Sequence, residues 1–264
     1  MNLVPNSLAL SHHQLILLAP YGIRVPPRFR DVRVDPQLYG SIIVDMQKLR
    51  GRIYLEDGAI ARHQLDKSGR HRSEVDTESW HLLSLDEKGF VSGCVRYHEH
   101  RNTVSFHDLT LRNCALASCG QWGGKLQSAV ESDLARARRQ AISFVEVGGW
   151  ALAKERRCTG EAVRTALATY GLARLLGGCV GIATATVRNR SSSILRRIGG
   201  GALEIGGEQL PAYYDPHYQC EMEIVRFTSN SPNPKYRRWI DQIAATLLNV
   251  PVLSLTSPNA LAVA

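Results

Sequence analysis

A strand, a basic turn, a helix and a second strand follow one another between residues 141 and 187, and this order constrains the fold more than any other feature. The first strand, AISFVEVGGWALA, contains Gly148-Gly149, and the stretch KERRCTGEAVRTAL (Lys154 to Leu167) follows it. An apolar helix face then continues to Gly177-Gly178, where glycines stop the helix. The next segment, CVGIATATV, has the nearly all-apolar character of a buried parallel strand. This order predicts an α/β fold whose strand-to-helix turn points free backbone N–H groups at an anion.

The segments on either side suggest one domain with extensions. Residues 1–36 are rich in Pro and Arg without a sustained period, so we expect an irregular N-terminal extension there. The domain is expected over 37–229, and a C-terminal helix and tail, packed on the domain, over 230–264. Within the domain the patterns predict helices near 38–53, 125–140 and 189–198, a late strand over 220–227, and a hairpin that turns at 86–89.

Composition limits the environment and the partners. Lys and Arg outnumber Asp and Glu by 32 to 24, giving a net charge of +8, which favours an acidic partner. The 6 cysteines form no CxxC pair, so we expect reduced thiols in a cytoplasmic protein. The N-terminal run LILLAP is too short for a signal core or a transmembrane segment, and nothing in the sequence suggests export.

The basic turn carries the pattern Arg157-x-x-Gly160-x-Ala162, and neither a Walker A string nor GxGxxG is present. The pattern resembles the (R/Q)xxGx(G/A) loop with which GCN5-related N-acetyltransferases bind the pyrophosphate of coenzyme A. The surrounding elements from about residue 80 to 227 follow the order of that family, including Asn189 at the start of a helix. The resemblance implies a GNAT-like α/β fold, a mixed central sheet flanked by helices.

Residues outside the loop resemble a narrower group, the N-acyl amino acid synthases and the related acyl-homoserine-lactone synthases. KLRGRIYLEDGAI places Arg50 and Tyr54 at matching positions. Further matches are Asp76, Gly93, Arg96, Glu146 and the late segment YYDPHYQCEMEIVRF. Two positions depart from the lactone-forming enzymes: Gly149, beside Trp150, stands where they have an Arg, and Ile60 stands in place of an aromatic residue. These departures disfavour the homoserine-lactone interpretation.

The resemblance implies catalytic roles for the first strand of the unit. Glu146 is the candidate general base, acting directly or through water, with a pKa raised by burial. Backbone N–H groups around Gly148 and Gly149 are candidates for binding the thioester carbonyl. The structural alternatives stay open: a strand carboxylate paired with an arginine, and a simple β-bulge.

The remaining candidates bind the donor or the acceptor. The predicted donor-phosphate site consists of Arg157, Cys158, Thr159, Gly160, Glu161, Ala162 and Asn189, with the Glu161 side chain pointing away from the anion. The predicted acceptor site consists of Arg50, Tyr54, Asp76, Arg96 and Trp150. An ordinary basic helix start and a structural ion-pair network are the respective alternatives. Cys158 is expected to be inert.

The basic residues suggest a protein partner rather than a nucleic acid. An acidic acyl carrier protein would dock on arginines if these gather around the loop, namely Arg136, Arg138, Arg139, Arg156, Arg157, Arg188, Arg190, Arg196 and Arg197. No nucleic-acid-binding motif is present. His98, His100 and His107 lack a dependable third ligand, so we predict surface histidines, no metal and no permanently bound cofactor.

The sequence therefore predicts an N-acyltransferase that moves a long-chain acyl group from acyl carrier protein or acyl-CoA to the amine of an amino acid. An acetyl-CoA-dependent N-acetyltransferase, an acyl-homoserine-lactone synthase and a non-catalytic basic binding module stay open as alternatives.

Overall fold

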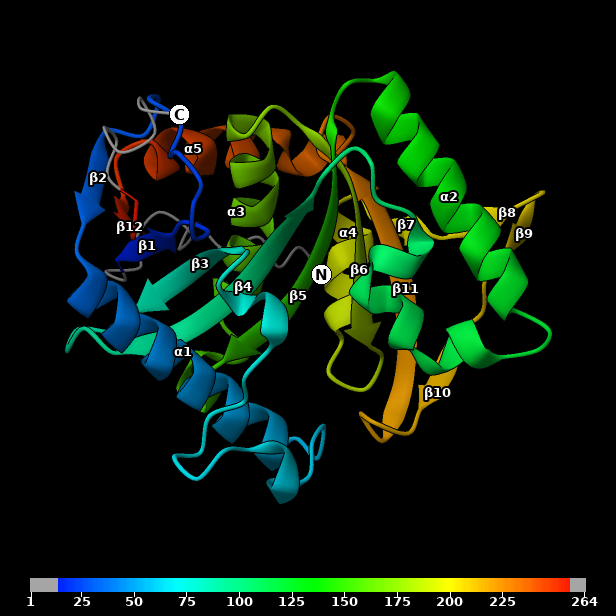
Figure 1. The fold of residues 1–264 in the computed structure, drawn as a ribbon, viewed down its shortest axis with the longest axis horizontal. Helices are drawn as coiled ribbons and strands as arrows, with labels where there is room; N and C mark the ends of the chain where they lie inside the picture. Colours follow the sequence, from blue (N-terminus) through cyan, green and yellow to red (C-terminus); the bar gives the residue numbers. More distant parts are fainter. Residues whose placement is uncertain (1–13, 257–264) are drawn as a thin grey trace.

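One large sheet organises the protein. The computed structural model describes residues 14–256, and within them ten strands form a mixed sheet in the order β10-β11-β6-β5-β4-β3-β1-β12-β2, with β7 paired to β11 (Figure 1). The strands of this sheet are β1 Leu15–Leu18, β2 Asp31–Val34, β3 Trp80–Leu85, β4 Val91–His100, β5 Ser143–Leu152, β6 Cys179–Thr186, β7 Gly201–Ala202, β10 Tyr213–Asp215, β11 Cys220–Thr228 and β12 Pro251–Ser254. A separate ribbon pairs β8 Glu204–Ile205 with β9 Glu208–Gln209.

Helices cover both faces of the sheet (Figure 1). The α-helices are α1 Pro36–Glu56, α2 Gly123–Arg139, α3 Glu161–Leu175, α4 Ser191–Ile198 and α5 Arg237–Leu247. The 3-10 helices are η2 Arg62–Gln64, η3 Glu74–Asp76, η4 Phe106–Asp108, η5 Thr110–Asn113, η6 Ala115–Ser118, η7 Lys154–Arg156 and η8 Pro234–Tyr236.

The alternation of side chains along the strands divides the core between the two faces. On β1, Leu15 and Leu17 belong to the cluster with α3, α4 and α5, whereas Ile16 and Leu18 belong to the cluster with α1. On β5, Phe144 joins a third cluster with α2. Both faces of the sheet are therefore buried, which is why β1 is apolar at every position.

The predicted central unit is confirmed. The strands β5 and β6 run parallel and are joined by α3, and Gly177 and Gly178 follow the helix with positive φ values of 104° and 95°. The predicted hairpin is β3–β4, whose turn includes Gly89 at φ 84°. The amphipathic helix near 38–53 is α1, capped by the Asp35 side chain, which accepts a hydrogen bond from the Leu38 N–H.

The prediction of an irregular segment up to residue 36 is wrong for its described part. Strand β1 lies inside the sheet between β3 and β12, and β2 pairs with β12. The strand β12, after the C-terminal helix, was also not predicted. These strands have four residues each, too few to show a period, and each pairs with a strand at the opposite end of the chain. Residues 1–13 and the tail 257–264 lie outside the described residues.

Candidate functional site

The parallel strands β5 and β6 part in the middle of the sheet. Their pairing runs from Ser143 opposite Cys179 to Val147 opposite Ala183. Beyond this point the rest of β5 stays paired with β4, and the rest of β6 stays paired with β11. A cavity of about 1130 Å³ lies at the opening and is bordered by residues of α1, β4, β5, α3, β6, α4 and β11. The parting turns backbone groups of both strands toward a ligand.

This cavity joins the segments predicted for the donor and for the acceptor. The predicted residues on its wall are Arg50, Tyr54, Arg96, Glu146, Gly148, Gly149, Trp150, Arg157, Cys158, Thr159, Gly160, Ala162 and Asn189. Asp76 and Glu161 lie behind the wall, with relative exposures of 1% and 5%. The cavity wall also includes His71, His217 and Tyr218, which were not predicted from the sequence.

One end of the cavity is apolar. Side chains of α3, α4 and β11 line it, namely Val163, Ala166, Tyr170, Ile194, Leu195, Val225 and Phe227. The rings of Tyr170 and Phe227 lie 5.2 Å apart between centroids. Gly181 makes room for the Phe227 ring, because a Cβ at this position would overlap it. A compartment of this kind suits a hydrocarbon chain.

The two glycines of β5 form a bulge that brings two arginines close to the backbone. The register of β4 and β5 shifts between Cys94 and Arg96, and Gly149 has a φ of 63°. A Cβ on Gly149 would lie 3.2 Å from the Cβ of Arg96 and 3.3 Å from Nη1 of Arg50. Glycine is therefore required both by the conformation and by the approach of the arginines.

Glu146 is a buried carboxylate with both oxygens occupied. Oε1 accepts hydrogen bonds from Thr110 Oγ1 at 2.7 Å and from Leu111 N at 2.8 Å. Oε2 lies 2.9 Å from both Thr110 N and His100 Nε2. Burial alone would raise the pKa of Glu146, but the hydrogen bonds from His100 and Thr110 hold it below its ordinary value. The expectation of a raised pKa is thus wrong, and the carboxylate is ionised at neutral pH.

The histidines of β4 are buried, which corrects the prediction of surface histidines for two of the three. His98 and His100 have relative exposures of 8% and 9%, while His107 is exposed. The His98 and His100 rings meet edge to face at 4.5 Å, and His98 Nδ1 lies 3.0 Å from Ser79 Oγ. Because residues two apart share one face of a strand, their spacing was the signal that could have linked them.

Arg50, Asp76 and Arg96 form an ion-pair network at the polar end of the cavity. Arg50 holds the Asp76 carboxylate with both terminal nitrogens, at 2.9 and 2.6 Å. Arg96 donates to Ser73 Oγ at 2.7 Å and lies 3.9 Å from Asp76 Oδ1. Burial would raise the pKa of Asp76, but the hydrogen bond and charge of Arg50 bring it down to about 2. The guanidinium groups of the buried Arg50 and the partly buried Arg96 thus share one carboxylate, and the network has a net positive charge.

The side chains of the predicted phosphate loop have partners of their own. Arg157 makes a two-pronged ion pair with Asp57, with both N···O distances at 2.8 Å. Cys158 is exposed and has a φ of 59°. The Glu161 side chain points away from the loop, as expected, and accepts a hydrogen bond from Ser84 Oγ at 2.5 Å. The ion pair with Asp57 was not predictable, because it joins residues 100 positions apart.

The arginines predicted as a docking face divide between two places: Arg157, Arg190 and Arg197 border the cavity, and three others lie far from it. Arg136, Arg138 and Arg139 lie in the last turn of α2, just before β5 begins, whereas the phosphate loop follows the end of β5. A strand of ten residues separates the two groups by about 30 Å. These three arginines therefore lie at the opposite end of β5 from the loop. Helix α4 begins at Ser191, so Asn189, predicted at the start of this helix, precedes it. Arg190 is the N-cap, with a φ of 60°.

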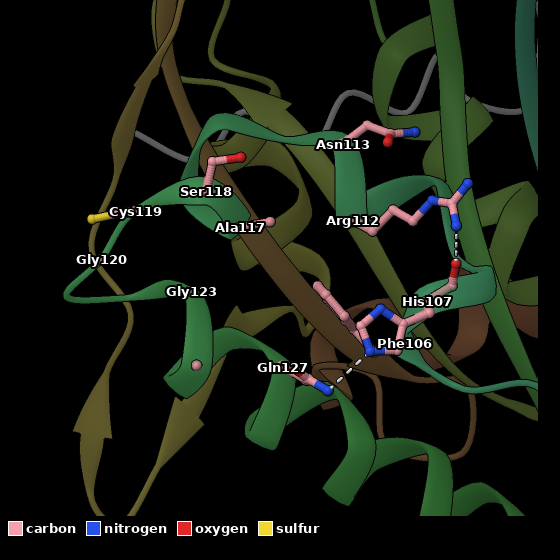
Figure 2. Close-up of a pocket in the computed structure, with 11 residues that line it drawn as sticks. Phe106, His107, Arg112, Asn113, Ala117, Ser118, Cys119, Gly120, Gly123 and Gln127 are labelled. Atoms are coloured by element: carbon pink, nitrogen blue, oxygen red, sulfur yellow. Dashed lines mark hydrogen bonds between the residues drawn. The ribbon is translucent and has the colours of Figure 1, made fainter.

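A second, smaller hollow lies beside the N-terminus of α2 (Figure 2). It has a volume of about 560 Å³, and its wall includes His107, Arg112 and Gln127. Arg112 donates to the backbone oxygen of His107, whose ring nitrogen Nε2 lies 3.4 Å from Gln127 Nε2. Asn113 is the one described residue that borders both hollows. The smaller hollow is therefore separate from the site around Glu146.

Two further observations concern residues 14–256. In this range no three His, Cys, Asp or Glu side chains are grouped so as to hold a metal ion. None of the helices in the same range has the length and apolar character needed to cross a bilayer.

Solved structures with a similar fold are acyl-transferring enzymes. No family model matches the sequence, and no curated protein matches it. The CoA-dependent acyl-homoserine lactone synthase BjaI, with SAM and isopentyl-CoA, aligns with a TM-score of 0.53 and 13% identity over 91% of this chain and 93% of that chain. The CoA-dependent acyl-homoserine lactone synthase MesI aligns with a TM-score of 0.53 and 15% identity over 89% and 95%.

A third solved structure, the N-acyl amino acid synthase FeeM from uncultured soil microbes, has a TM-score of 0.46 and 10% identity over 75% of this chain and 88% of that chain. The fold assignment rests on the two synthases with the higher scores. The chain has the GNAT-like acyltransferase fold, with a mixed central sheet flanked by helices, as the sequence resemblance implied.

Proposed function

We propose that this protein is an N-acyltransferase that moves an acyl group from a phosphopantetheine thioester, carried by CoA or by acyl carrier protein, to the amine of an amino acid. The observation that carries the proposal is the cavity at the parting of β5 and β6. It has an apolar compartment at one end and, at the other, one buried and one partly buried arginine that share a single carboxylate. This charge balance favours an acceptor that brings a carboxylate of its own.

The proposed acceptor site follows from the hydrogen-bonding capacity that remains on Arg50 and Arg96. Asp76 is fully engaged by Arg50, so its role is to hold that side chain rather than to bind the acceptor ammonium. Arg96 donates a hydrogen bond to Ser73 Oγ and borders the cavity. The acceptor carboxylate would therefore bind chiefly to Arg96. Tyr54 and Trp150, on the same wall, would flank it.

The proposed donor site lies at the start of α3. Backbone N–H groups of residues 158–162 and the positive end of the helix dipole would hold the pantetheine phosphate. The pantetheine arm would then run along the freed edges of β5 and β6, and the acyl chain would enter the apolar compartment. This course places the thioester near Gly148 and Gly149, whose N–H groups would stabilise the oxyanion.

The reaction forms one C–N bond and breaks one C–S bond. The neutral amine attacks the thioester carbonyl, the tetrahedral intermediate expels the thiolate, and the nitrogen loses one proton. Glu146 is the proposed acceptor of that proton, because it is ionised and borders the cavity. Its hydrogen bond from Thr110 Oγ1 is the one a substrate can replace, since a hydroxyl group can rotate toward another acceptor.

The test is production of the protein in a bacterial host, followed by mass spectrometry of the lipid extract. We expect a new N-acyl amino acid, absent with Glu146→Gln and retained with Glu221→Gln, an exposed carboxylate of β11. An N-acyl homoserine lactone would instead assign the lactone-forming reaction, and turnover with acetyl-CoA alone would assign an acetyltransferase. If the host makes abundant, well-folded protein and its lipid extract is unchanged, the proposal is contradicted. The remaining interpretation would then be a non-catalytic binding module.

A further inference from the structure

The Asp57 carboxylate forms an ion pair with both terminal nitrogens of Arg157. Both N–H···O distances of the ion pair are 2.8 Å, and the two side chains border the cavity. The pair is only partly shielded from water, with exposures of 34% for Arg157 and 17% for Asp57. The two-pronged geometry is the one a guanidinium also adopts with a phosphate. Asp57 therefore sits in the place that a phosphate on Arg157 would take.

The position of Asp57 in its helix makes this carboxylate a weakly held anion. Asp57 is the C-cap of α1, where the negative end of the helix dipole disfavours a negative charge. Its own backbone oxygen accepts a hydrogen bond from Arg188 Nη2 at 2.5 Å, which holds the main chain whether or not the carboxylate stays on Arg157. The side chain can thus leave Arg157 without unwinding the end of α1.

We propose that Asp57 is a specificity-determining residue for the donor: its carboxylate competes with the donor phosphate for Arg157 and so lowers the affinity for the phosphopantetheine group. This inference rests on the proposed function, in which Arg157 belongs to the phosphate site. A donor phosphate must displace Asp57 before Arg157 can pair with it. Donors that reach Arg157 with more negative charge displace the carboxylate more readily, so the pair discriminates donors by the charge of their phosphate.

A neighbouring ion pair provides a matched control. Glu56 Oε2 lies 3.4 Å from Lys154 Nζ and joins the same two elements, the end of α1 and η7. Neither residue borders the cavity. Glu56→Gln and Asp57→Asn each remove one negative charge near the loop, so they alter its general electrostatics alike. They differ in whether the removed charge faces Arg157.

The experiment is calorimetric titration of the full-length protein with 4′-phosphopantetheine and with pantetheine, which lacks the phosphate. We expect Asp57→Asn to bind 4′-phosphopantetheine about 2- to 5-fold more tightly than the wild type, the upper part of the range for losing one competing charge at a partly exposed ion pair. Glu56→Gln is expected to change this affinity less than twofold. In the Arg157→Ala background, Asp57→Asn is expected to have no effect, and pantetheine affinity is expected to stay constant throughout.

The outcomes separate the inference from the proposed function. If the wild type binds 4′-phosphopantetheine but Asp57→Asn binds it equally or more weakly, the competition is refuted while the donor site stands. Equal gains from Asp57→Asn and Glu56→Gln, or a gain that persists without Arg157, would also refute it. If the wild type, confirmed as folded by circular dichroism, binds neither 4′-phosphopantetheine nor CoA, the proposed donor site fails, and the inference fails with it.

Discussion

His100 Nε2 lies 2.9 Å from the carboxylate of Glu146, and both side chains are buried on the neighbouring strands β4 and β5. This contact, with three further donors from Thr110 and Leu111, fixes the carboxylate in its charged form at the point where β5 and β6 part. The same contacts tie the short helix η5 to the sheet. Glu146 therefore combines a proposed chemical role with a structural one, and substitutions must be judged on both.

Glu146→Gln should lower both activity and stability. The amide nitrogen of Gln cannot accept the hydrogen bonds that one carboxylate oxygen now receives, so buried donors lose their acceptor, at a cost of about 1–3 kcal/mol in the free energy of unfolding. Acyl transfer should fall by about 10²- to 10⁴-fold, as for loss of a general base. Urea denaturation and initial rates at saturating donor measure the two effects. A folded variant with wild-type rates would exclude Glu146 as the base.

Asp76→Asn should destabilise the protein strongly. The substitution leaves the buried Arg50 without its counter-charge, and breaking a buried ion pair in this way costs about 3–5 kcal/mol. The control is Asp31→Asn, which removes the partner of Arg33 in an exposed pair and should leave the denaturation midpoint unchanged. Comparable midpoints for the two variants would show that the buried network contributes little to stability.

Stability should fall as the pH is lowered from about 6.5 to 4. Burial lowers the pKa of His71, His81 and His98 to about 4, whereas histidines in the unfolded chain titrate near 6.5. Between these values the unfolded state binds more protons, so the free energy of unfolding decreases with falling pH. Above about 6.5 this contribution is fully present.

Chemical denaturation at pH 7, 6, 5 and 4 measures this dependence. His81→Gln removes one of the titrating groups while keeping a donor for the Asp76 backbone oxygen, to which His81 Nε2 is bonded at 2.7 Å. The variant should show a shallower decline in stability than the wild type. An identical decline would mean that His81 does not contribute to it.

Gly149→Ala and Gly40→Ala should have opposite effects on stability. Gly149 has a positive φ, and a Cβ there would press on Arg50 and Arg96, so we expect a loss of about 1–3 kcal/mol together with lower activity. Gly40 lies in α1, where a Cβ would meet nothing within 4 Å, so alanine should stabilise the protein by about 0.5–1 kcal/mol. Thermal denaturation of the two variants checks the signs. A gain in stability for both variants would mean that the bulge accommodates the added methyl group without a cost in free energy.

The central elements were predictable because their signals are local. Glycines mark the ends of α3, the strands on either side of it are long and apolar, and the hairpin β3–β4 turns at Gly89. The strands β1, β2 and β12 were not predictable, since each has four residues and pairs with at least one strand at the other end of the chain. A window of sequence contains no trace of such pairings.

The sequence predicted which residues belong to the site better than it predicted the contacts that they make. The motif and the resemblance identified residues from six separate segments, and the structure gathers most of them on one cavity wall. The charge states depended on partners that sequence does not reveal. Glu146 has a lowered pKa because His100 of β4 and Thr110 donate hydrogen bonds to it, and Arg157 is neutralised by Asp57, a residue not predicted to belong to the site.

The place of β12 between β1 and β2 has a consequence for synthesis on the ribosome. Leu17 pairs with Val252, and Val32 pairs with the same residue from the other side. Until residues 251–254 have left the exit tunnel, β1 has an open edge and β2 has no neighbouring strand. Strand β2 thus waits for a partner that is made much later, and the open edge of β1 needs protection from aggregation in the meantime.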